Sequence, residues 1–517
     1  MNSRGNYLNT VIIMYKNPAY NYSARSTLKL IKESRGAYWA KKREINSLDL
    51  FHRAASQVPA YKKFLKKHNV NQNEIRTWRD FQALPQMNKE NYLRKYKLNE
   101  LVWEGSLKQP LVFTATSGST GEPVYFVRNQ QLDWQYSVIL ENFIKEGMKD
   151  KPGPVLIIIS FGMGLWIGGI ITYKAFELAA QRSNLPVSII TPGINKREII
   201  NSLRRLSSHY GQTIIVGYPP FVKDVIDEAP EQGIDIDKLN IRMLFAAEAI
   251  TEEFRDYVAE KAKMKNRFLD TMNIYGSADI GAMAYETGVS ILVKRLAMKT
   301  PELFKDIFND IYKTPTLAQF NPLYISFEEV DKQLLLTGNS AMPLVRYAIG
   351  DNGGVFSYDD LVKKMRNHGT SLDKELKKVG IDKNVAKLPF VYVYERKDFS
   401  VKLHLRDIYP QIIKDALLSP GINEILTGKF TMTTKYNARQ NQYLELNLEE
   451  RKGRKVSREA ADLIKKIILK ALYLKTDGPG DPNEFVKRPN LLKLVFWPAE
   501  HPLHFAPGIK QKWVKKE

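Results

Sequence analysis

Between residues 155 and 247, short apolar runs alternate with segments whose apolar residues recur at helical spacing. The runs are typical of buried strands and cover residues 155–160, 187–191, 213–217 and 242–247. The segments between them predict helices that end near residue 180 and that span 196–208 and 220–229. Strands that alternate with helices indicate βαβ units, because parallel neighbours need a crossover connection. We therefore expect an α/β fold whose sheets are mixed and largely parallel.

One part of this region imitates a membrane span. Residues 155–173 carry no charge and approach the length that a bilayer requires. Glycines at 162, 164, 168 and 169 interrupt the stretch, so we expect a strand, a glycine-rich turn and a helix, with no membrane span. The apolar run at residues 10–15 is too short for a secretory signal. The chain has no cysteine, which excludes disulfides and suits the reducing cytoplasm where we expect the protein, as a monomer or homodimer.

The net charge of +22 favours a polyanionic partner or substrate, since 78 Lys and Arg outnumber 56 Asp and Glu. The basic residues are nevertheless scattered along the chain, and no motif typical of DNA or RNA binding accompanies them. Solvated surface lysine is the favoured interpretation. Nucleic-acid binding remains the less favoured hypothesis.

A Gly/Ser/Thr-rich loop follows the apolar residues 111–113 and precedes the apolar residues 124–127, so we expect a strand on each side of it. Gly118 and Gly121 let the backbone turn with its N–H groups inward, and hydroxyl side chains add donors that suit phosphate oxygens. An ordinary Gly/Ser turn is the alternative, because the loop lacks the Gly-Lys-Ser/Thr ending of a P-loop. The loop residues that we expect to bind phosphate are Thr116, Ser117, Gly118, Ser119, Thr120 and Gly121.

The rest of the chain predicts a helical lead-in over residues 1–105, with helices at 26–41 and 47–67, and a second domain at the C-terminus. We place the large domain at 1–394 and the small α+β domain at 395–517. Two extra helical segments, at about 288–320 and 358–387, interrupt the large domain.

Five motifs in a fixed order carry a family resemblance. They are Thr116 to Pro123, Phe161-Gly-x-Gly-Leu165, Ala246-Ala-Glu248, Asn273 to Asp279, and Arg346-Tyr-x-x-Gly-Asp351. Together they resemble the adenylate-forming superfamily, and within it the phenylacetate–CoA ligase branch, over most of residues 50–517. The resemblance implies an enzyme that uses ATP and Mg²⁺ to convert a carboxylic acid to an acyl-adenylate, releases pyrophosphate, and passes the acyl group to a nucleophile.

The same resemblance assigns roles to residues of the large domain. The phosphate loop would hold the β- and γ-phosphates, Asp351 would accept both ribose hydroxyls, and Asp279 would bind the metal. The remaining nucleotide-binding residues would be Ala247, Glu248, Tyr275, Gly276, Ser277 and Arg346. The substrate pocket would contain Phe161, Gly162, Trp166 and Tyr218, although aromatic residues are more often simply core residues.

In the C-terminal domain the resemblance implies a mobile lid. Arg396 would approach the nucleotide, and Asp398 would be the pivot of the lid. Lys510, or Lys512 if the alignment slips by two, would bridge the substrate carboxylate and the α-phosphate and stabilise the charge that develops there.

Three positions depart from the family pattern. Asp279 stands in place of a glutamate, Ala278 in place of a Ser or Thr, and Leu405 in place of a glycine that passes close to CoA. The acceptor is therefore open: CoA, an amine, a hydroxyl or a carrier-protein thiol. These departures and the charge of +22 also support an alternative, a non-catalytic relative that binds nucleotide or nucleic acid.

Overall fold

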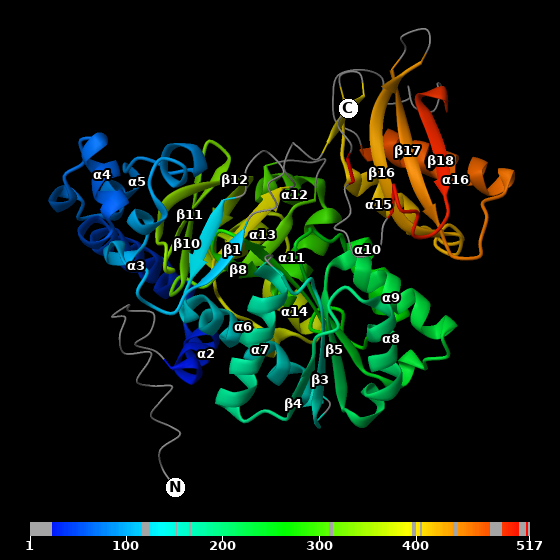
Figure 1. Cartoon of the computed structure of the whole chain (residues 1–517), viewed down its shortest axis with the longest axis horizontal. Coiled ribbons are helices and arrows are strands. Elements are labelled where there is room, and N and C mark those ends of the chain that lie inside the picture. The colour runs from blue at the N-terminus through cyan, green and yellow to red at the C-terminus, as the bar shows by residue number, and fades with distance from the viewer. Residues whose placement is uncertain are drawn as a thin grey trace.

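The computed structural model describes residues 23–115, 124–150, 152–164, 167–309, 314–394, 400–403, 406–437, 442–475, 489–505 and 513–514. Within these ranges its largest sheet has 11 strands in the order β10-β11-β12-β13-β9-β8-β7-β6-β5-β3-β4. A small C-terminal sheet, seen in orange and red in Figure 1, stands beside the large one.

One half of the large sheet is parallel, as the alternating sequence pattern predicts. The four predicted strands are β3 (Val155–Ser160), β4 (Val187–Ile190), β5 (Gln212–Gly217) and β6 (Ile241–Ala246), and β7 (Thr271–Ser277) joins them in parallel. Helices α6 (Gln130–Asp150), α7 (Ile167–Ser183), α8 (Lys196–Arg205), α9 (Pro219–Glu231) and α10 (Glu252–Lys261) alternate with these strands or flank them.

Strand β3 shows why the sequences of the parallel strands are continuous apolar runs. Val155, Ile157 and Ile159 face the core that contains α6 and α7. Leu156 and Ile158 face the opposite core, which contains α8 and α9. A strand that is buried on both faces needs apolar residues at every position, so it shows no alternation.

The other half of the sheet pairs antiparallel. It consists of β8 (Gly281–Tyr285), β9 (Thr316–Gln319), β10 (Ile325–Val330), β11 (Gln333–Gly338), β12 (Leu344–Phe356) and β13 (Phe390–Tyr394). The predicted α/β class with mixed sheets is confirmed, but the large sheet is not largely parallel. Among its described strands, four neighbouring pairs are parallel, all between β4 and β7, and six are antiparallel.

The two extra segments are mainly helical, but the first, expected to be helical to about residue 320, ends in strand β9 of the large sheet. They contain α11 (Gly288–Met298), α12 (Pro301–Phe308), α13 (Tyr358–Asn367) and α14 (Leu372–Lys378), whose apolar faces share one core with β13. In Figure 1 these helices lie behind the central strands.

The N-terminal helices differ from the prediction in their breaks. The structure has α2 (Ala24–Glu33), α3 (Gly36–Gln57), α4 (Pro59–Lys67) and α5 (Trp78–Gln82). The predicted helix at 47–67 is divided because Pro59 occupies the first turn of α4 and cannot continue α3. The other break follows from an extended Ser34, the C-cap of α2. Shorter helical turns are η2 (Gln72–Glu74), η3 (Lys89–Leu93), η4 (Leu98–Leu101), η5 (Trp103–Gly105), η6 (Ser207–His209), η7 (Ile236–Lys238), η8 (Asp382–Asn384) and η10 (Pro489–Leu491).

The C-terminal elements have a core of their own, built from residues between Val401 and Trp513. They are β14 (Val401–Leu403), β15 (Arg406–Ile408), α15 (Pro410–Leu417), β16 (Leu426–Tyr436), β17 (Gln442–Glu450), α16 (Arg458–Lys475) and β18 (Leu492–Trp497). In the part of the chain that the structure describes, no helix is long and apolar enough to cross a membrane. Within the stretch 155–173, residues 155–160 instead form β3, and α7 begins at Ile167.

Candidate functional site

Several predicted site residues lie outside the described residues. They are the phosphate loop from Thr116 to Gly121, Trp166, Arg396, Asp398, Leu405, Lys510 and Lys512. The strands on either side of the loop are described: β1 (Val112–Ala115) pairs antiparallel with β2 (Tyr125–Arg128). The two strands predicted on either side of the loop are therefore present.

Tyr275 and Asp351, which we expect to hold the nucleoside, lie in direct contact. The Tyr275 hydroxyl donates to Asp351 Oδ2 at 2.7 Å. The Tyr275 ring lies at 28° to the ring of Phe327, with 6.1 Å between their centroids. These contacts fix the Asp351 carboxylate at the edge of an aromatic surface, although 76 positions separate the two bonded residues in the chain.

Asp279 lies in the turn between β7 and β8 and is 5% exposed. The buried Tyr347 donates its hydroxyl proton to Asp279 Oδ2 at 2.9 Å. Lys89 Nζ lies 3.8 Å from the same oxygen. Sequence reasoning missed both partners. The signal for Tyr347 was its place directly after Arg346 in the motif, whereas nothing local marked Lys89.

The segment before Asp279 is tightly packed. A Cβ at Gly276 would lie 2.8 Å from the carbonyl oxygen of Gly281, so only glycine fits there. Ser277 Oγ accepts from the backbone N–H of Asp279 at 3.3 Å. The structure thus places Tyr275, Gly276 and Ser277 at the end of β7 and Asp279 in the turn that follows, with Tyr275 bonded to Asp351.

Ala247 and Glu248 form the turn after β6. Ala247 has a positive φ of 74°, which is rare outside glycine and marks a tightly constrained backbone. The Glu248 carbonyl accepts from Asn273 Nδ2 at 3.1 Å. The Glu248 carboxylate forms an ion pair with Lys414 of α15, so this turn contacts the C-terminal domain.

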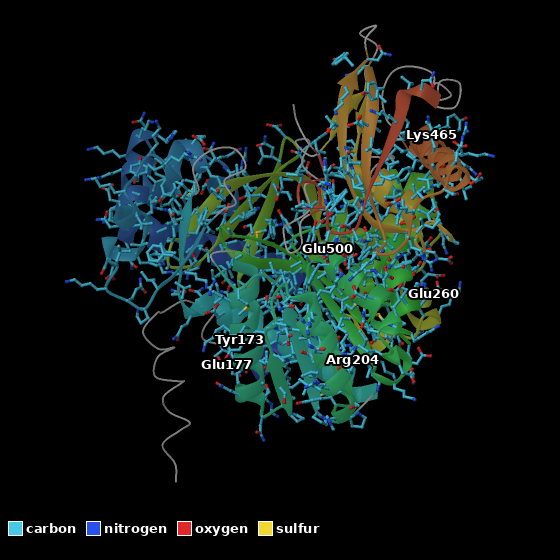
Figure 2. All side chains as sticks on the ribbon, turned by 45° about the vertical axis from the view of Figure 1, so that its right-hand side comes forward. Tyr173, Glu177, Arg204, Glu260, Lys465 and Glu500 are labelled. Carbon is cyan, nitrogen blue, oxygen red and sulfur yellow. The ribbon has the colours of Figure 1, made fainter. Side chains whose placement is uncertain are left out.

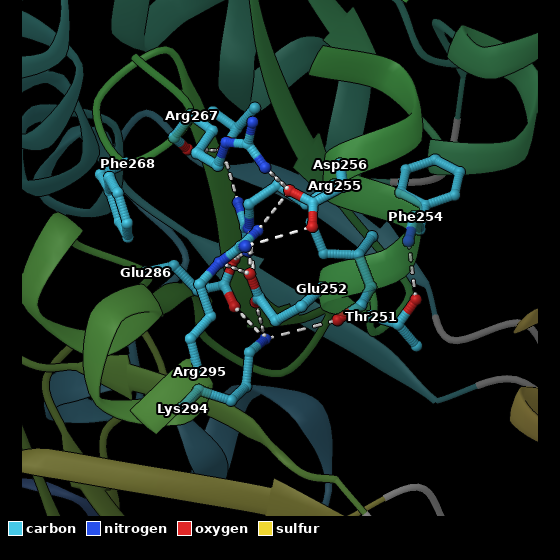
Figure 3. A network of polar contacts seen from close by, with 12 residues as sticks. Thr251, Glu252, Phe254, Arg255, Asp256, Arg267, Phe268, Glu286, Lys294 and Arg295 are labelled. Atoms are coloured by element: carbon cyan, nitrogen blue, oxygen red, sulfur yellow. Dashed lines mark hydrogen bonds and ion pairs between the residues drawn. The ribbon is translucent and has the colours of Figure 1, made fainter. Parts of the chain in front are cut away.

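A buried ion network holds the helix that follows this turn (Figure 3). Glu252, near the start of α10, forms ion pairs with Lys294 of α11 at 2.8 Å and with Arg255 at 3.1 Å. Glu286, which follows β8, pairs with Arg255 and with Lys294 at 3.1 Å. Arg295 adds bonds of 2.7 Å to Glu252 and to Asp256.

The positive charges of this network keep the Glu252 carboxyl ionised. Burial by itself would raise the pKa of Glu252, but Arg255, Lys294 and Arg295 outweigh it and lower that pKa to about 2. Lys294 Nζ also lies 3.5 Å from the Ile250 carbonyl oxygen, two residues after Glu248. The first extra helical segment therefore anchors the backbone that leads from the predicted adenine-binding turn into α10.

The Arg346 side chain bonds to residues other than Tyr275 and Asp351. Its side chain is 4% exposed and pairs with Glu328 at 3.2 Å and with the backbone carbonyl of Leu84. Its backbone adopts a positive φ of 48° beside Tyr347. These contacts join β12 to β10 and to the N-terminal helical region.

The described residues of the predicted substrate pocket lie at the carboxyl ends of two neighbouring strands. Ser160 of β3 is the ladder partner of Gly217 of β5, so Phe161 and Tyr218 follow paired positions. A Cβ at Gly169 would lie 2.4 Å from the Gly162 carbonyl oxygen, which shows how closely α7 approaches this turn. Ligands of open α/β sheets bind outside these strand ends.

A group of ion pairs joins α9 to the C-terminal domain. Asp227 accepts from Lys223 at 2.7 Å, from Tyr257 at 2.7 Å and from Arg451 at 2.6 Å. Burial by itself would raise the pKa of Asp227, but Lys223 and Arg451 outweigh it and lower that pKa. Glu500, labelled in Figure 2 between the two parts of the molecule, lies 3.7 Å from Lys196.

His501 and His504, which could suggest a metal site, pack against an aromatic ring. Their ring centroids lie 4.6 Å and 4.0 Å from that of Trp497. Among the described residues, no group of three or more His, Cys, Asp or Glu side chains could hold a metal ion.

Comparisons of the sequence with known protein families and with curated proteins found no match. Solved structures do match. A 2-hydroxyisobutyryl-CoA ligase in its postadenylation state superposes with a TM-score of 0.62 at 14% identity, over 95% of this chain and 92% of that one. The acyl acid amido synthetase AtGH3.15, in complex with 2,4-DB, gives a TM-score of 0.57 at 12% identity, over 97% and 95%.

This chain has the adenylate-forming fold. The superfamily resemblance of the motifs is therefore confirmed at the level of fold, and no finding distinguishes the phenylacetate–CoA ligase branch within it.

Proposed function

We propose that the protein uses ATP to activate a carboxylic acid as its acyl-adenylate and then transfers the acyl group to a nucleophile. The observation that carries this proposal is the bonded Tyr275–Asp351 pair beside the turn that bears Asp279, in a chain with the adenylate-forming fold. The contact orients an aromatic surface and a carboxylate toward one nucleoside, because a carboxylate with two acceptor oxygens can take both ribose hydroxyls.

Asp279 is our candidate for binding Mg²⁺. Mg²⁺ at nucleotide sites commonly takes one or two protein carboxylates and completes its shell with phosphate oxygens and water, so one buried carboxylate fits this donor set. The bond from Tyr347 orients the carboxylate. When bound, the metal would neutralise charge on the phosphates.

The remaining roles come from the motif resemblance. In this proposal the loop from Thr116 to Gly121 holds the β- and γ-phosphates with its backbone N–H groups and hydroxyls. Lys510 stabilises the charge that develops as the carboxylate oxygen attacks the α-phosphorus and pyrophosphate leaves. Arg396 approaches the nucleotide, and Asp398 is the pivot of the C-terminal lid.

The proposed domain division is 1–394 and 395–517. The separate core of the C-terminal elements supports it. The pairs Lys414–Glu248 and Arg451–Asp227 would hold the lid against the large domain in the orientation described here. Any rotation of the lid has to break both pairs.

The structural neighbours support two acceptors. One is named as a CoA ligase and the other as an amido synthetase, so a thiol and an amine are both represented among proteins of this fold. Leu405 in place of a glycine favours an acceptor other than CoA, because a leucine side chain would crowd a pantetheine tunnel.

The test is acid-dependent ATP–pyrophosphate exchange with purified protein, Mg²⁺ and a library of carboxylic acids. We expect exchange with some acids, and its loss in Asp351→Ala. A Lys510→Ala variant should lose exchange but still bind ATP. Glu33→Gln, at an exposed pair on α2, is the matched control and should keep full activity. No exchange with any acid, combined with salt-sensitive RNA binding, would favour the non-catalytic alternative.

A further inference from the structure

A small cavity lies between α6, β8 and the segment before β10. Its volume is about 10 Å³, which is close to the space of one water-sized group. Leu132, Ile280 and Met283 are among the apolar residues that line it. Among the described residues, no charged side chain lines it.

Two amide side chains in the cavity wall lack hydrogen-bond partners. Gln135 Nε2 and Asn321 Nδ2 are buried and have no partner among the described residues. Gln135 is 7% exposed and Asn321 is 3% exposed. An unpaired buried N–H group is destabilising, so such donors are seldom left without an acceptor.

The orientation of Asn321 is fixed by its own turn. Asn321 Oδ1 accepts from the backbone N–H of Leu323 at 3.0 Å. The other end of the amide, which bears two N–H donors, is therefore the end without a partner. The cavity thus offers donors and requires an acceptor.

The cavity adjoins the proposed reaction centre through its wall. Ile280 directly follows Asp279, and Ala282, also in the wall, is the ladder partner of Gly276. A Cβ at Gly281 would lie 3.0 Å from Ile171 of α7 and 3.9 Å from Leu132. α6, α7 and the cavity wall therefore meet at Gly281.

We infer that this cavity receives the far end of the acid substrate, and that Gln135 and Asn321 recognise an uncharged oxygen there, either a hydroxyl or a carbonyl. This inference rests on the proposed function. A terminal oxygen matches the cavity in size and supplies the acceptor that two amide donors require. A second carboxylate does not match, because a buried charge needs a cationic partner and the described residues of the wall include no Lys or Arg.

The experiment compares matched acids in the exchange assay. Each pair has the same number of non-hydrogen atoms and ends either in a hydroxyl or in a methyl group, for example para-hydroxy and para-methyl arylacetic acids, or linear ω-hydroxy and alkanoic acids. For the best chain length, the wild type should prefer the hydroxylated acid by at least about tenfold in kcat/KM, because the methyl analogue leaves both donors unpaired. The dicarboxylic acid of that length should be rejected.

Two variants assign the preference to the amides. Gln135→Met keeps the length of the side chain and removes its donors, and Asn321→Ser keeps a short acceptor for the Leu323 N–H and removes the amide N–H groups. Each should reduce the preference to about threefold or less. The control is Ile139→Leu, a volume-conserving change in the same wall, and it should leave the preference unchanged.

Three results would overturn the inference. Exchange with equal rates for the two acids of every pair would refute it and leave the proposed function intact. A Gln135→Met variant that keeps the wild-type preference would do the same. A marked fall in Tm for that variant without substrate would show that the amide already has a structural partner, such as a fixed water. Absence of exchange with every acid would instead remove the proposed function, and the inference with it.

Discussion

Removal of one charge from the buried ion network of Figure 3 should destabilise the large domain strongly. Glu286 is 1% exposed, and its carboxylate pairs with Arg255 and Lys294, neither of which reaches solvent. Glu286→Gln keeps the shape of the side chain but leaves an uncompensated positive charge. Loss of one partner from a buried pair typically costs about 3–5 kcal/mol.

This free energy converts to a measurable change in melting temperature. Unfolding entropy is about 2.1 cal/mol/K per residue, so a domain of about 370 residues that unfolds as one unit has an entropy of about 0.8 kcal/mol/K. A loss of 3–5 kcal/mol then lowers Tm by about 4–6 °C. Differential scanning calorimetry of the whole chain measures this change, and the exposed Glu33→Gln control should change Tm by less than about 1 °C.

A double-mutant cycle tests the cause. Lys294→Met removes the positive charge that faces Glu286, so the double variant should lose less stability than the sum of the two single variants, by at least about 1 kcal/mol. A Glu286→Gln variant that melts within 1 °C of the wild type would refute the reasoning. Strict additivity in the cycle would also refute it, because it would show that the two residues do not act as a pair.

Three further predictions concern single contacts. Tyr275→Phe removes the 2.7 Å bond to Asp351 and should weaken ATP binding about tenfold in calorimetric titration, whereas unchanged affinity would separate that bond from the nucleotide site. Burial raises the pKa of Asp133 from 3.8 to about 6, so its ionisation removes up to about 3 kcal/mol of unfolding free energy as the pH rises from 4 to 7. Asp133→Asn should lack this loss in urea unfolding at the two pH values, and equal pH dependence in both proteins would contradict the assignment. Asp227→Ala removes the acceptor of Arg451 and should speed limited proteolysis between the large domain and the C-terminal domain, while an unchanged cleavage rate would show that Asp227 does not hold the lid.

The sequence predicted the elements that depend on local patterns. Apolar runs bounded by turn residues placed β3 to β6, and the Gly/Ser/Thr-rich segment was correctly placed between two strands. The pattern did not predict how the sheet continues. A buried strand is apolar whether its neighbours run parallel or antiparallel. The antiparallel pairing of the strands from β8 to β13 could therefore be seen only in the structure.

The motifs also predicted part of the candidate site. Tyr275, Ser277, Asp279 and Asp351 were singled out from short motifs, and the structure brings them together around one turn and one strand. Arg346 came from the same reasoning, yet its guanidinium pairs with Glu328. A motif gives the type and order of residues, but it does not give the direction in which a side chain points.

The chain by itself therefore determined which segments become strands and helices, and which residues are suited to nucleotide chemistry, because these properties depend on residue type and on spacing of a few positions. Only the tertiary structure decided which side chains share an environment. Lys414 pairs with Glu248, Tyr347 bonds to Asp279, and Gln135 lines the same cavity as Asn321. These partners lie too far apart in the sequence for helix or strand periodicity to predict the contacts. Burial then gives these contacts their energetic weight, since a charge or an amide removed from water is stable only beside a partner that the fold provides.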